Sequence, residues 1–176
     1  MQSLAIIGLC IASAVVYGIL HDQITARLCV EYFTIGHPPV FGTNDPTLLG
    51  IGWGIIATWW GGLLLGIPMA LAARAGKHPK RSAASLLRPI GTLLAVMAFS
   101  AGVAGVAGWL LSSQGAVFLA GTLAKAVPQD KHVLFLTDAW AHSASYVVGF
   151  LGGAALIVSV WRSRSRTAKI VIADGN

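Results

Sequence analysis

Apolar residues fill four long stretches of this chain, and polar residues collect between the stretches and at the ends. The stretches cover about residues 4–20, 46–73, 90–111 and 133–161. A helix that crosses a bilayer needs about 20 predominantly apolar residues, so each stretch is close to the length of one span. The pattern predicts an all-α integral membrane protein, a bundle of four transmembrane helices in a single membrane domain, residues 1–176.

The polar segment after the first stretch is expected to extend the first helix. Neither glycine nor proline interrupts residues 19–33, so this helix is predicted to continue to residue 33, with Arg27 and Glu31 as an i,i+4 pair. A cleaved signal peptide is the alternative, because residues 12–14 resemble a cleavage site. The absence of a cation in residues 1–3 and the longer apolar run favour a retained span.

Proline and glycine positions predict where the later helices begin and bend. Asp45 followed by Pro46 is typical of a helix start, with the carboxylate as N-cap and proline at the first helical position. Pro68 is expected to kink the second helix. Residues 116–127 have the composition of a short helix lying in the interface, and Pro128 can open the last helix.

The charges predict which side of the membrane each loop faces. Five cations without an acid separate the second and third stretches, and four follow the last: Arg74, Lys77, Lys80, Arg81 and Arg88, then Arg162, Arg164, Arg166 and Lys169. Because cytoplasmic loops are enriched in Lys and Arg, both termini are predicted to be cytoplasmic, with helices one and four extended on the extracytoplasmic side. The net charge of +6 therefore reflects topology, and nucleic-acid binding is excluded.

This topology gathers ionisable residues on the extracytoplasmic side. Five of the six acids and four of the five histidines fall there. Asp138 and His142 share a helix face at i,i+4 spacing, and His21 is expected at a similar depth. The proposed ligands are His21, Asp138 and His142, with Glu31 and His37 as additional ones.

Imidazole and carboxylate groups suit a transition metal, or haem in the case of histidine. The alternatives are a structural hydrogen-bonded pair and a proton-transfer site. The motif HExxH, the nucleophile elbow GxSxG and the P-loop are absent, so the sequence identifies no reaction.

Small residues recur at helix-packing spacing on the second, third and fourth stretches: Gly50, Gly54, Gly62 and Gly66, then Ala98, Gly102, Gly105 and Gly108, then Gly149 and Gly153. Such faces allow close approach of helices within the bundle, of a second copy, or of another membrane protein. A non-enzymatic accessory subunit is therefore the alternative function. Transport is less favoured, because the second and third spans carry no charge and an oligomer would be needed.

The two cysteines cannot pair within one chain. Cys10 and Cys29 would lie roughly 28 Å apart on one helix, well beyond disulfide reach. Cys10 is expected to be buried, and Cys29 to be a free thiol on the extracytoplasmic side.

The segments from His21 to Pro38 and from Trp140 to Tyr146 resemble those of small bacterial four-span membrane proteins. The resemblance covers most of the chain. It implies a location in a bacterial inner membrane and assigns no activity, cofactor or site residue.

Overall fold

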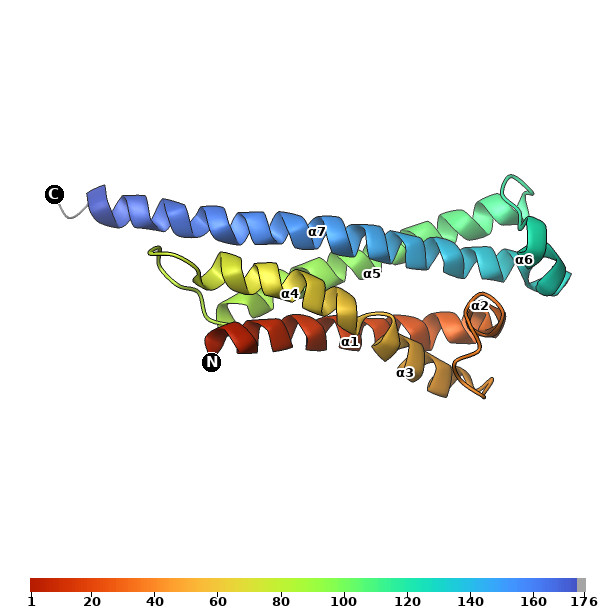
Figure 1. Cartoon of the computed structure of the whole chain (residues 1–176). Helices are drawn as coiled ribbons and strands as arrows, with labels where there is room; N and C mark the ends of the chain where they lie inside the picture. Colours follow the sequence, from red (N-terminus) through yellow and green to blue (C-terminus); the bar gives the residue numbers. More distant parts are fainter. Residues whose placement is uncertain (174–176) are drawn as a thin grey trace.

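The computed structural model describes the backbone of residues 1–173 and the side chains of residues 1–165. Within this part, regular structure is entirely helical, and four helical segments are long and apolar enough to span a membrane: Gln2–Leu28, Pro46–Arg74, Ala84–Ser113 and Gln129–Ser165. They run alternately in opposite directions, so the start of α1 and the far end of α7 lie at the same end of the bundle (Figure 1). The predicted all-helical architecture, with four helices long and apolar enough to span a membrane, is thus confirmed.

Two helix pairs make up the bundle. The helices are α1 (Gln2–Leu28), α2 (Val30–Thr34), α3 (Pro46–Ile56), α4 (Trp59–Arg74), α5 (Leu87–Ser113), α6 (Gly121–Ala126) and α7 (His132–Ala173), with 3-10 turns at Ala84–Leu86 and Gln129–Lys131. α1 packs against α3 and α4, and α5 packs along α7. Contacts between α4 and α7 join the two pairs.

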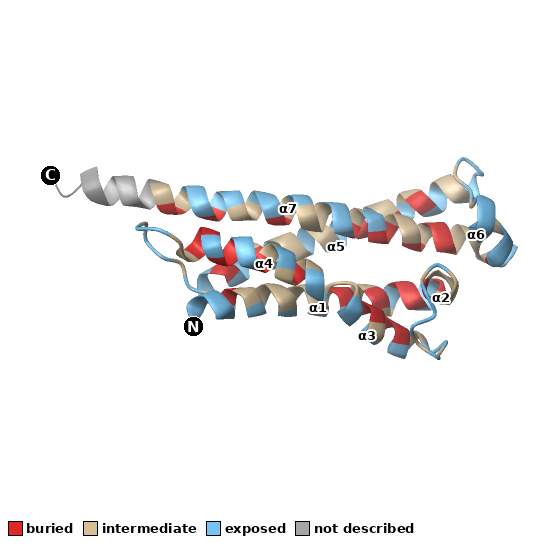
Figure 2. Ribbon diagram, viewed as in Figure 1, coloured by how far each residue is buried: buried red, intermediate tan, exposed pale blue. Residues whose placement is uncertain are grey.

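The outer surfaces of the helices are apolar. Phe99 on α5 is 75% exposed, and Leu151 on α7 is 68% exposed. Buried residues line the surfaces where the helices face one another, and exposed ones face outward (Figure 2). Contact of such a surface with lipid tails has no free-energy penalty, whereas its exposure to water is unfavourable. The distribution of burial therefore fits a bilayer.

The first helix ends earlier than predicted. The backbone of Cys29 is extended, with φ −148° and ψ 95°, so α1 stops at Leu28 and α2 begins at Val30. The predicted continuation to residue 33 as one helix is therefore wrong. The turn directs Phe33 into a buried cluster with Leu49 and Trp53, and this apolar contact explains a break that no glycine or proline marks.

The second span is two helices rather than one. α3 and α4 are separated at Ala57 and Thr58, whereas Pro68 lies inside α4. At this break the Thr58 hydroxyl donates to the carbonyl oxygen of Gly54, and Gly54 lies directly against Ile19 of α1. The close crossing of α1 and α3 thus lies within one turn of the break.

The predicted N-cap of the second span is confirmed. The Oδ1 atom of Asp45 accepts hydrogen bonds from the backbone N–H groups of Thr47 and Leu48, at 2.8 and 2.9 Å. Pro46 occupies the first helical position.

Replacing Asp45 by alanine is expected to lower the free energy of unfolding by about 1 kcal/mol, because two N–H groups lose their acceptor. Unfolding followed by circular dichroism in mixed micelles measures this loss. Asp45→Asn keeps an acceptor oxygen and should retain most of the stability. Equal stability of Asp45→Ala and the parent protein would contradict the role of the cap.

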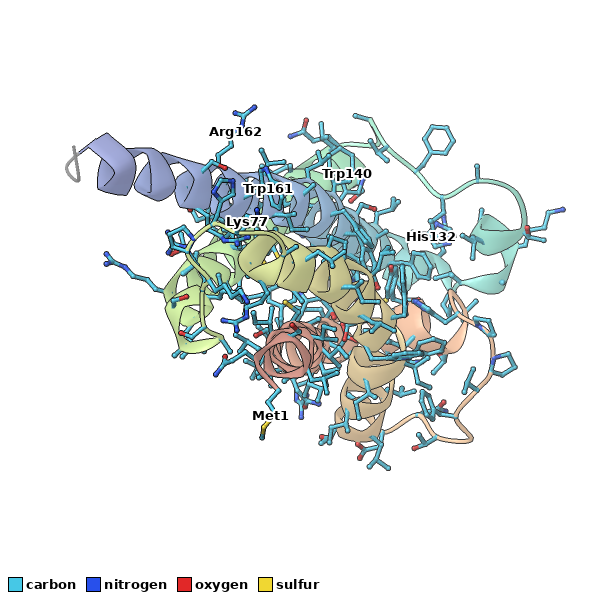
Figure 3. All side chains as sticks on the ribbon, turned by 60° about the vertical axis from the view of Figure 1, so that its left-hand side comes forward. Met1, Lys77, His132, Trp140, Trp161 and Arg162 are labelled. Carbon is cyan, nitrogen blue, oxygen red and sulfur yellow. The ribbon has the colours of Figure 1, made fainter. Side chains whose placement is uncertain are left out.

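The last helix is longer than predicted. α7 begins at His132, one residue from the expected start, but continues to Ala173 instead of ending at residue 161, because neither glycine nor proline occurs in residues 162–173. Lys77, Trp161 and Arg162 lie toward one end of the molecule and His132 toward the other (Figure 3). Of the cations used to predict topology, the side chains of Arg166 and Lys169 lie outside the described residues.

Candidate metal centre

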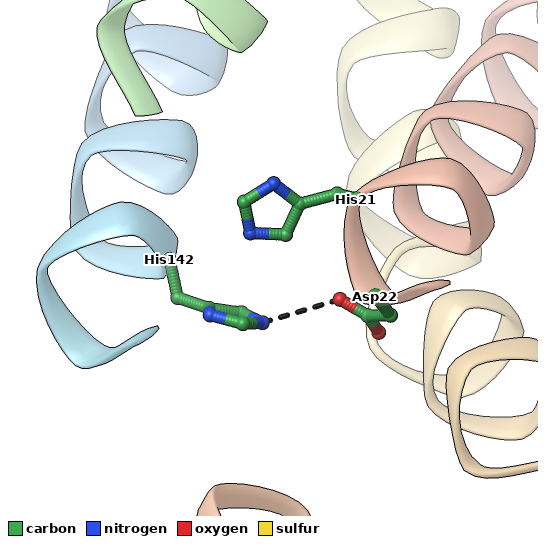
Figure 4. Close-up of side chains that lie close together, drawn as sticks. All are labelled: His21, Asp22 and His142. Atoms are coloured by element: carbon green, nitrogen blue, oxygen red, sulfur yellow. Dashed lines mark hydrogen bonds and ion pairs between the residues drawn. The ribbon is translucent and has the colours of Figure 1, made fainter. Parts of the chain in front are cut away.

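Three ionisable side chains from two helices converge inside the bundle. His21 and Asp22 lie near the end of α1, and His142 lies on α7. One ligand atom from each of the three residues lies within 4.8 Å of the others. Figure 4 shows the two helices presenting these side chains to one another. Asp22 is six residues, or about 9 Å, from the end of α1, so the cluster lies within the helical bundle, just after the apolar stretch 4–20.

The ring of His142 is held in one orientation. Its Nδ1 atom lies 2.8 Å from the backbone carbonyl oxygen of Asp138, and its Nε2 atom lies 3.1 Å from Oδ1 of Asp22. A carbonyl oxygen only accepts, so Nδ1 carries a hydrogen and donates it. The Nε2 atom is thereby directed at the Asp22 carboxylate.

His21 provides a second imidazole with an uncommitted nitrogen. Its Nε2 atom is buried and finds no hydrogen-bond partner within the described part of the chain. The ring meets His142 edge to face, with centroids 4.5 Å apart, and stacks on Tyr17 at 5.8 Å. Since a buried polar atom without a partner is unfavourable, this nitrogen is suited to binding a group that enters the cluster.

The surroundings of the cluster are dry. Asp22 and His142 are 5% and 6% exposed, and the rings of Tyr32 and Phe33 lie 4.5 and 5.7 Å from the His142 ring. A charged carboxylate is strongly disfavoured in such surroundings unless a positive group neutralises it. Whatever lies between Nε2 of His142 and the Asp22 oxygen must therefore carry positive charge, either a proton or a cation.

The structure brings Asp22, which the sequence did not predict, together with His21 and His142, and places Asp138 outside this group. Asp138 is fully buried, but both its carboxylate oxygens lack a hydrogen-bond partner among the described residues, and it is outside the group of three. Asp138 contacts the cluster through its backbone carbonyl oxygen, which accepts a hydrogen bond from Nδ1 of His142. Asp22 follows His21 directly, and an acid within an apolar helix is the sequence signal that could have identified it.

The two additional predicted ligands also lie outside this group. Glu31 accepts a hydrogen bond from Sγ of Cys29 at 3.4 Å. The Nδ1 atom of His37 lies 2.8 Å from the carbonyl oxygen of Tyr32, and its ring lies 4.6 Å from that of Trp53. The predicted pair of Arg27 with Glu31 does not form, because Arg27 donates to Gln23 and Thr47.

Cys29 lies in an environment that suppresses its reactivity, packed with Val127 and Phe135. Burial raises the pKa of its thiol to about 12, and the nearby carboxylates of Glu31 and Asp138 act in the same direction, although a backbone hydrogen bond from Tyr32 opposes them. Burial also raises the pKa of the Tyr32 hydroxyl. Between pH 7 and 9 both groups stay protonated, so neither carries negative charge.

Cys29 is therefore expected to resist alkylation. In a Cys10→Ser background at pH 7.5, its rate of maleimide labelling should be at least roughly 100-fold below that of an exposed cysteine, because the thiolate is the reactive form. The comparison is Asn44→Cys in a protein lacking both native cysteines. Labelling of native Cys29 as fast as that of Asn44→Cys would contradict its burial, and unfolding should remove the difference.

A cavity of about 130 Å³ extends from the cluster toward the middle of the bundle. Polar groups, among them Tyr17, Asp22 and Ser145, occur in its lining close to the cluster, and the hydroxyls of Tyr17 and Ser145 are hydrogen bonded at 2.8 Å. Farther along, the lining is apolar, with Leu65, Leu93 and Leu156. Such a lining does not replace the hydration shell of an ion, so the cavity gives no ion path through one chain.

Comparison with family models, with curated proteins and with solved structures finds no match to this chain.

Proposed function

We propose that this protein binds one divalent transition-metal ion, with zinc as the first choice, through His21, Asp22 and His142. The orientation of His142 carries the proposal. Metal-bound histidine typically donates its other ring N–H to a carbonyl or carboxylate, which fixes the tautomer and directs the free nitrogen at the metal. His142 has this arrangement, with Nδ1 bonded to the Asp138 carbonyl and Nε2 facing a carboxylate.

The distances suit a small ion better than haem. Ligand atoms about 2.1 Å from a tetrahedral zinc ion lie about 3.4 Å apart, so separations within 4.8 Å must shrink by at most about 1.4 Å. Two imidazoles on opposite faces of a haem would have centroids about 6 Å apart. The 4.5 Å between His21 and His142 leaves no room for the porphyrin.

Three protein ligands leave one position of a tetrahedral ion open. Sites with two histidines, one carboxylate and an open position are used for catalysis, whereas purely structural zinc sites have four protein ligands. The open position would face the cavity beside the cluster, where a water molecule or a small ligand can enter. We assign no reaction to it.

Zinc binding to the detergent-purified, chelator-treated protein tests the proposal. Equilibrium dialysis should give one zinc per chain for the parent protein and none for the His21→Ala, His142→Ala double variant. The control is His78→Ala, because His78 lies at the other end of the bundle against Trp161. Absence of stoichiometric zinc in the parent, or binding unchanged in the double variant, would overturn the proposal.

We further infer a bacterial inner-membrane location with both termini in the cytoplasm, which puts the metal site near the extracytoplasmic side. The support is the excess of cations at the end of the bundle where α1 starts. A reporter active only in the cytoplasm, fused to either terminus, should be active. Inactive fusions at both ends would reverse the orientation.

An accessory role in a membrane complex is the second candidate, favoured by one feature of α5. Small exposed residues recur every three or four positions along one face of α5: Gly91, Ala95, Ala98 and Gly102. Another helix could approach this face closely. Most other small residues named from the sequence pack inside the bundle, as Gly54 and Gly62 do against α1. Gly102→Ile should dissociate a complex that uses this stripe, seen as a smaller mass by light scattering in mild detergent.

A further inference from the structure

A basic pocket lies at the opposite end of the bundle from the metal site. Its volume is about 470 Å³, and it is bounded by the end of α4, the following loop, the start of α1 and α7. Four cations and two hydroxyl side chains contribute to its lining: Arg74, Lys80, Arg81, Arg164, Ser82 and Ser85.

Arg164 is the buried base of this pocket. It is only 1% exposed, and its guanidinium donates hydrogen bonds to four backbone carbonyl oxygens after or near the end of α4, those of Ala72, Ala75, His78 and Pro79. These acceptors hold the side chain and close the C-terminal end of the helix. The four carbonyl groups carry no net charge, so none of them compensates the positive charge of the buried guanidinium.

The other cations of the pocket are also held by neutral groups. Arg74 donates to the carbonyl oxygen of Arg81 at 3.3 Å, and Arg81 donates to the Ser163 hydroxyl at 3.1 Å. Within the described side chains, no ion pair joins an acid to any of the four cations of the pocket. All the acids with described side chains lie on segments of the other end: Asp22, Glu31, Asp45, Asp130 and Asp138.

The pocket lies at the ends of apolar helices, where a surrounding bilayer would have its head groups. It follows directly on the apolar spans, and Trp161, a residue type enriched at membrane interfaces, lies 5.9 Å from the Arg164 guanidinium. Leu87, two residues after Ser85 of the pocket lining, is 56% exposed and offers an apolar surface. A ligand with an anionic head and apolar chains matches both environments, and basic pockets between helices are known to hold phospholipid head groups.

We propose that this pocket binds the phosphate of an anionic phospholipid head group. The phosphate neutralises the cations of the pocket, which form no ion pair with an acid among the described side chains. The acyl chains lie along the exposed apolar surface beside Leu87. The proposal does not depend on the metal site or on which side of the membrane the pocket faces.

Native mass spectrometry of the full-length protein in mild detergent tests this binding. Phosphatidylglycerol should remain bound at one molecule per chain, and zwitterionic phosphatidylcholine should not. Lys80→Ala, Arg81→Ala should weaken phosphatidylglycerol binding roughly 30-fold, because each basic residue near a membrane surface contributes a few-fold or more to anionic lipid affinity. The buried Arg164 is left unchanged so that the fold is kept.

The matched control removes the same charge outside the pocket. Lys77→Ala, Arg162→Ala deletes two cations at the same end of the molecule (Figure 3) and should leave lipid binding within about twofold. An equal loss in both double variants would show nonspecific attraction and overturn the proposal. Equal retention of the two lipids would also overturn it. Displacement of phosphatidylglycerol by millimolar inorganic phosphate would instead identify a free-phosphate site and reject the lipid as its ligand.

Discussion

Replacing His142 by alanine is expected to weaken zinc binding at least roughly 100-fold, or about 3 kcal/mol. The change removes a proposed ligand and leaves the buried Asp22 carboxylate without its partner. Even loss of a group that only orients a ligand typically reduces metal affinity about 10- to 100-fold, so loss of the ligand itself should exceed this. Competition titration with a zinc-sensitive dye measures the affinity.

Two other variants make the result specific. His132→Ala removes an imidazole on the same helix whose Nε2 lies 3.0 Å from the carbonyl oxygen of Val127, away from the cluster, and zinc affinity should not change. Asp138→Asn keeps the backbone carbonyl that orients His142, so affinity should fall much less than in His142→Ala. A loss for Asp138→Asn as large as for His142→Ala would make Asp138 a ligand and contradict the assignment of Asp22 in its place.

Replacing Gly54 by alanine is expected to destabilise the bundle by about 2 kcal/mol or more. A Cβ at this position would lie 2.5 Å from the backbone nitrogen and 2.6 Å from the Cα of Ile19, so one helix must shift. Because the same crossing brings Gly50 against the backbone of Asp22, the shift should also weaken zinc binding. Unfolding in mixed micelles measures the stability, and dye competition measures the affinity.

Gly102→Ala is the matched control for this substitution. A Cβ at Gly102 meets no atom within 4 Å, so the same added methyl group should leave stability unchanged or raise it by about 0.5–1 kcal/mol through helix propensity. Wild-type stability in Gly54→Ala would contradict the close packing of α1 and α3. A comparable loss in both variants would show that it arises from the helix itself rather than from the crossing.

The apolar pattern predicted the number of spans because length and hydrophobicity alone decide whether a segment can cross a bilayer. The breaks in the helices were harder to predict. The break at Cys29 and the interruption after Ile56 carry neither proline nor glycine, whereas Pro68 lies inside α4. These boundaries depend on contacts between helices, such as the burial of Phe33 and the crossing at Gly54, which the pattern along one helix does not contain.

Helix length predicted that the two histidines of the cluster lie close together. His21 and His142 were expected at one depth from helix length, and the structure brings their rings together. Which acid lies beside the histidines depends on how each helix is rotated about its axis. Asp138 shares a face with His142 but contributes its backbone carbonyl to the cluster, while Asp22 reaches His142 from α1. Rotation of one helix against another follows from side-chain packing across their interface, which spacing within one helix does not reveal.

The ligands of bound zinc test the central claim most directly. X-ray absorption at the zinc edge of the loaded protein should show two imidazole nitrogens and oxygen at about 2.0–2.1 Å, without sulfur. In the His21→Ala, His142→Ala variant this signal should disappear. A first shell without imidazole, or one containing the Cys29 sulfur, would contradict binding at His21, Asp22 and His142.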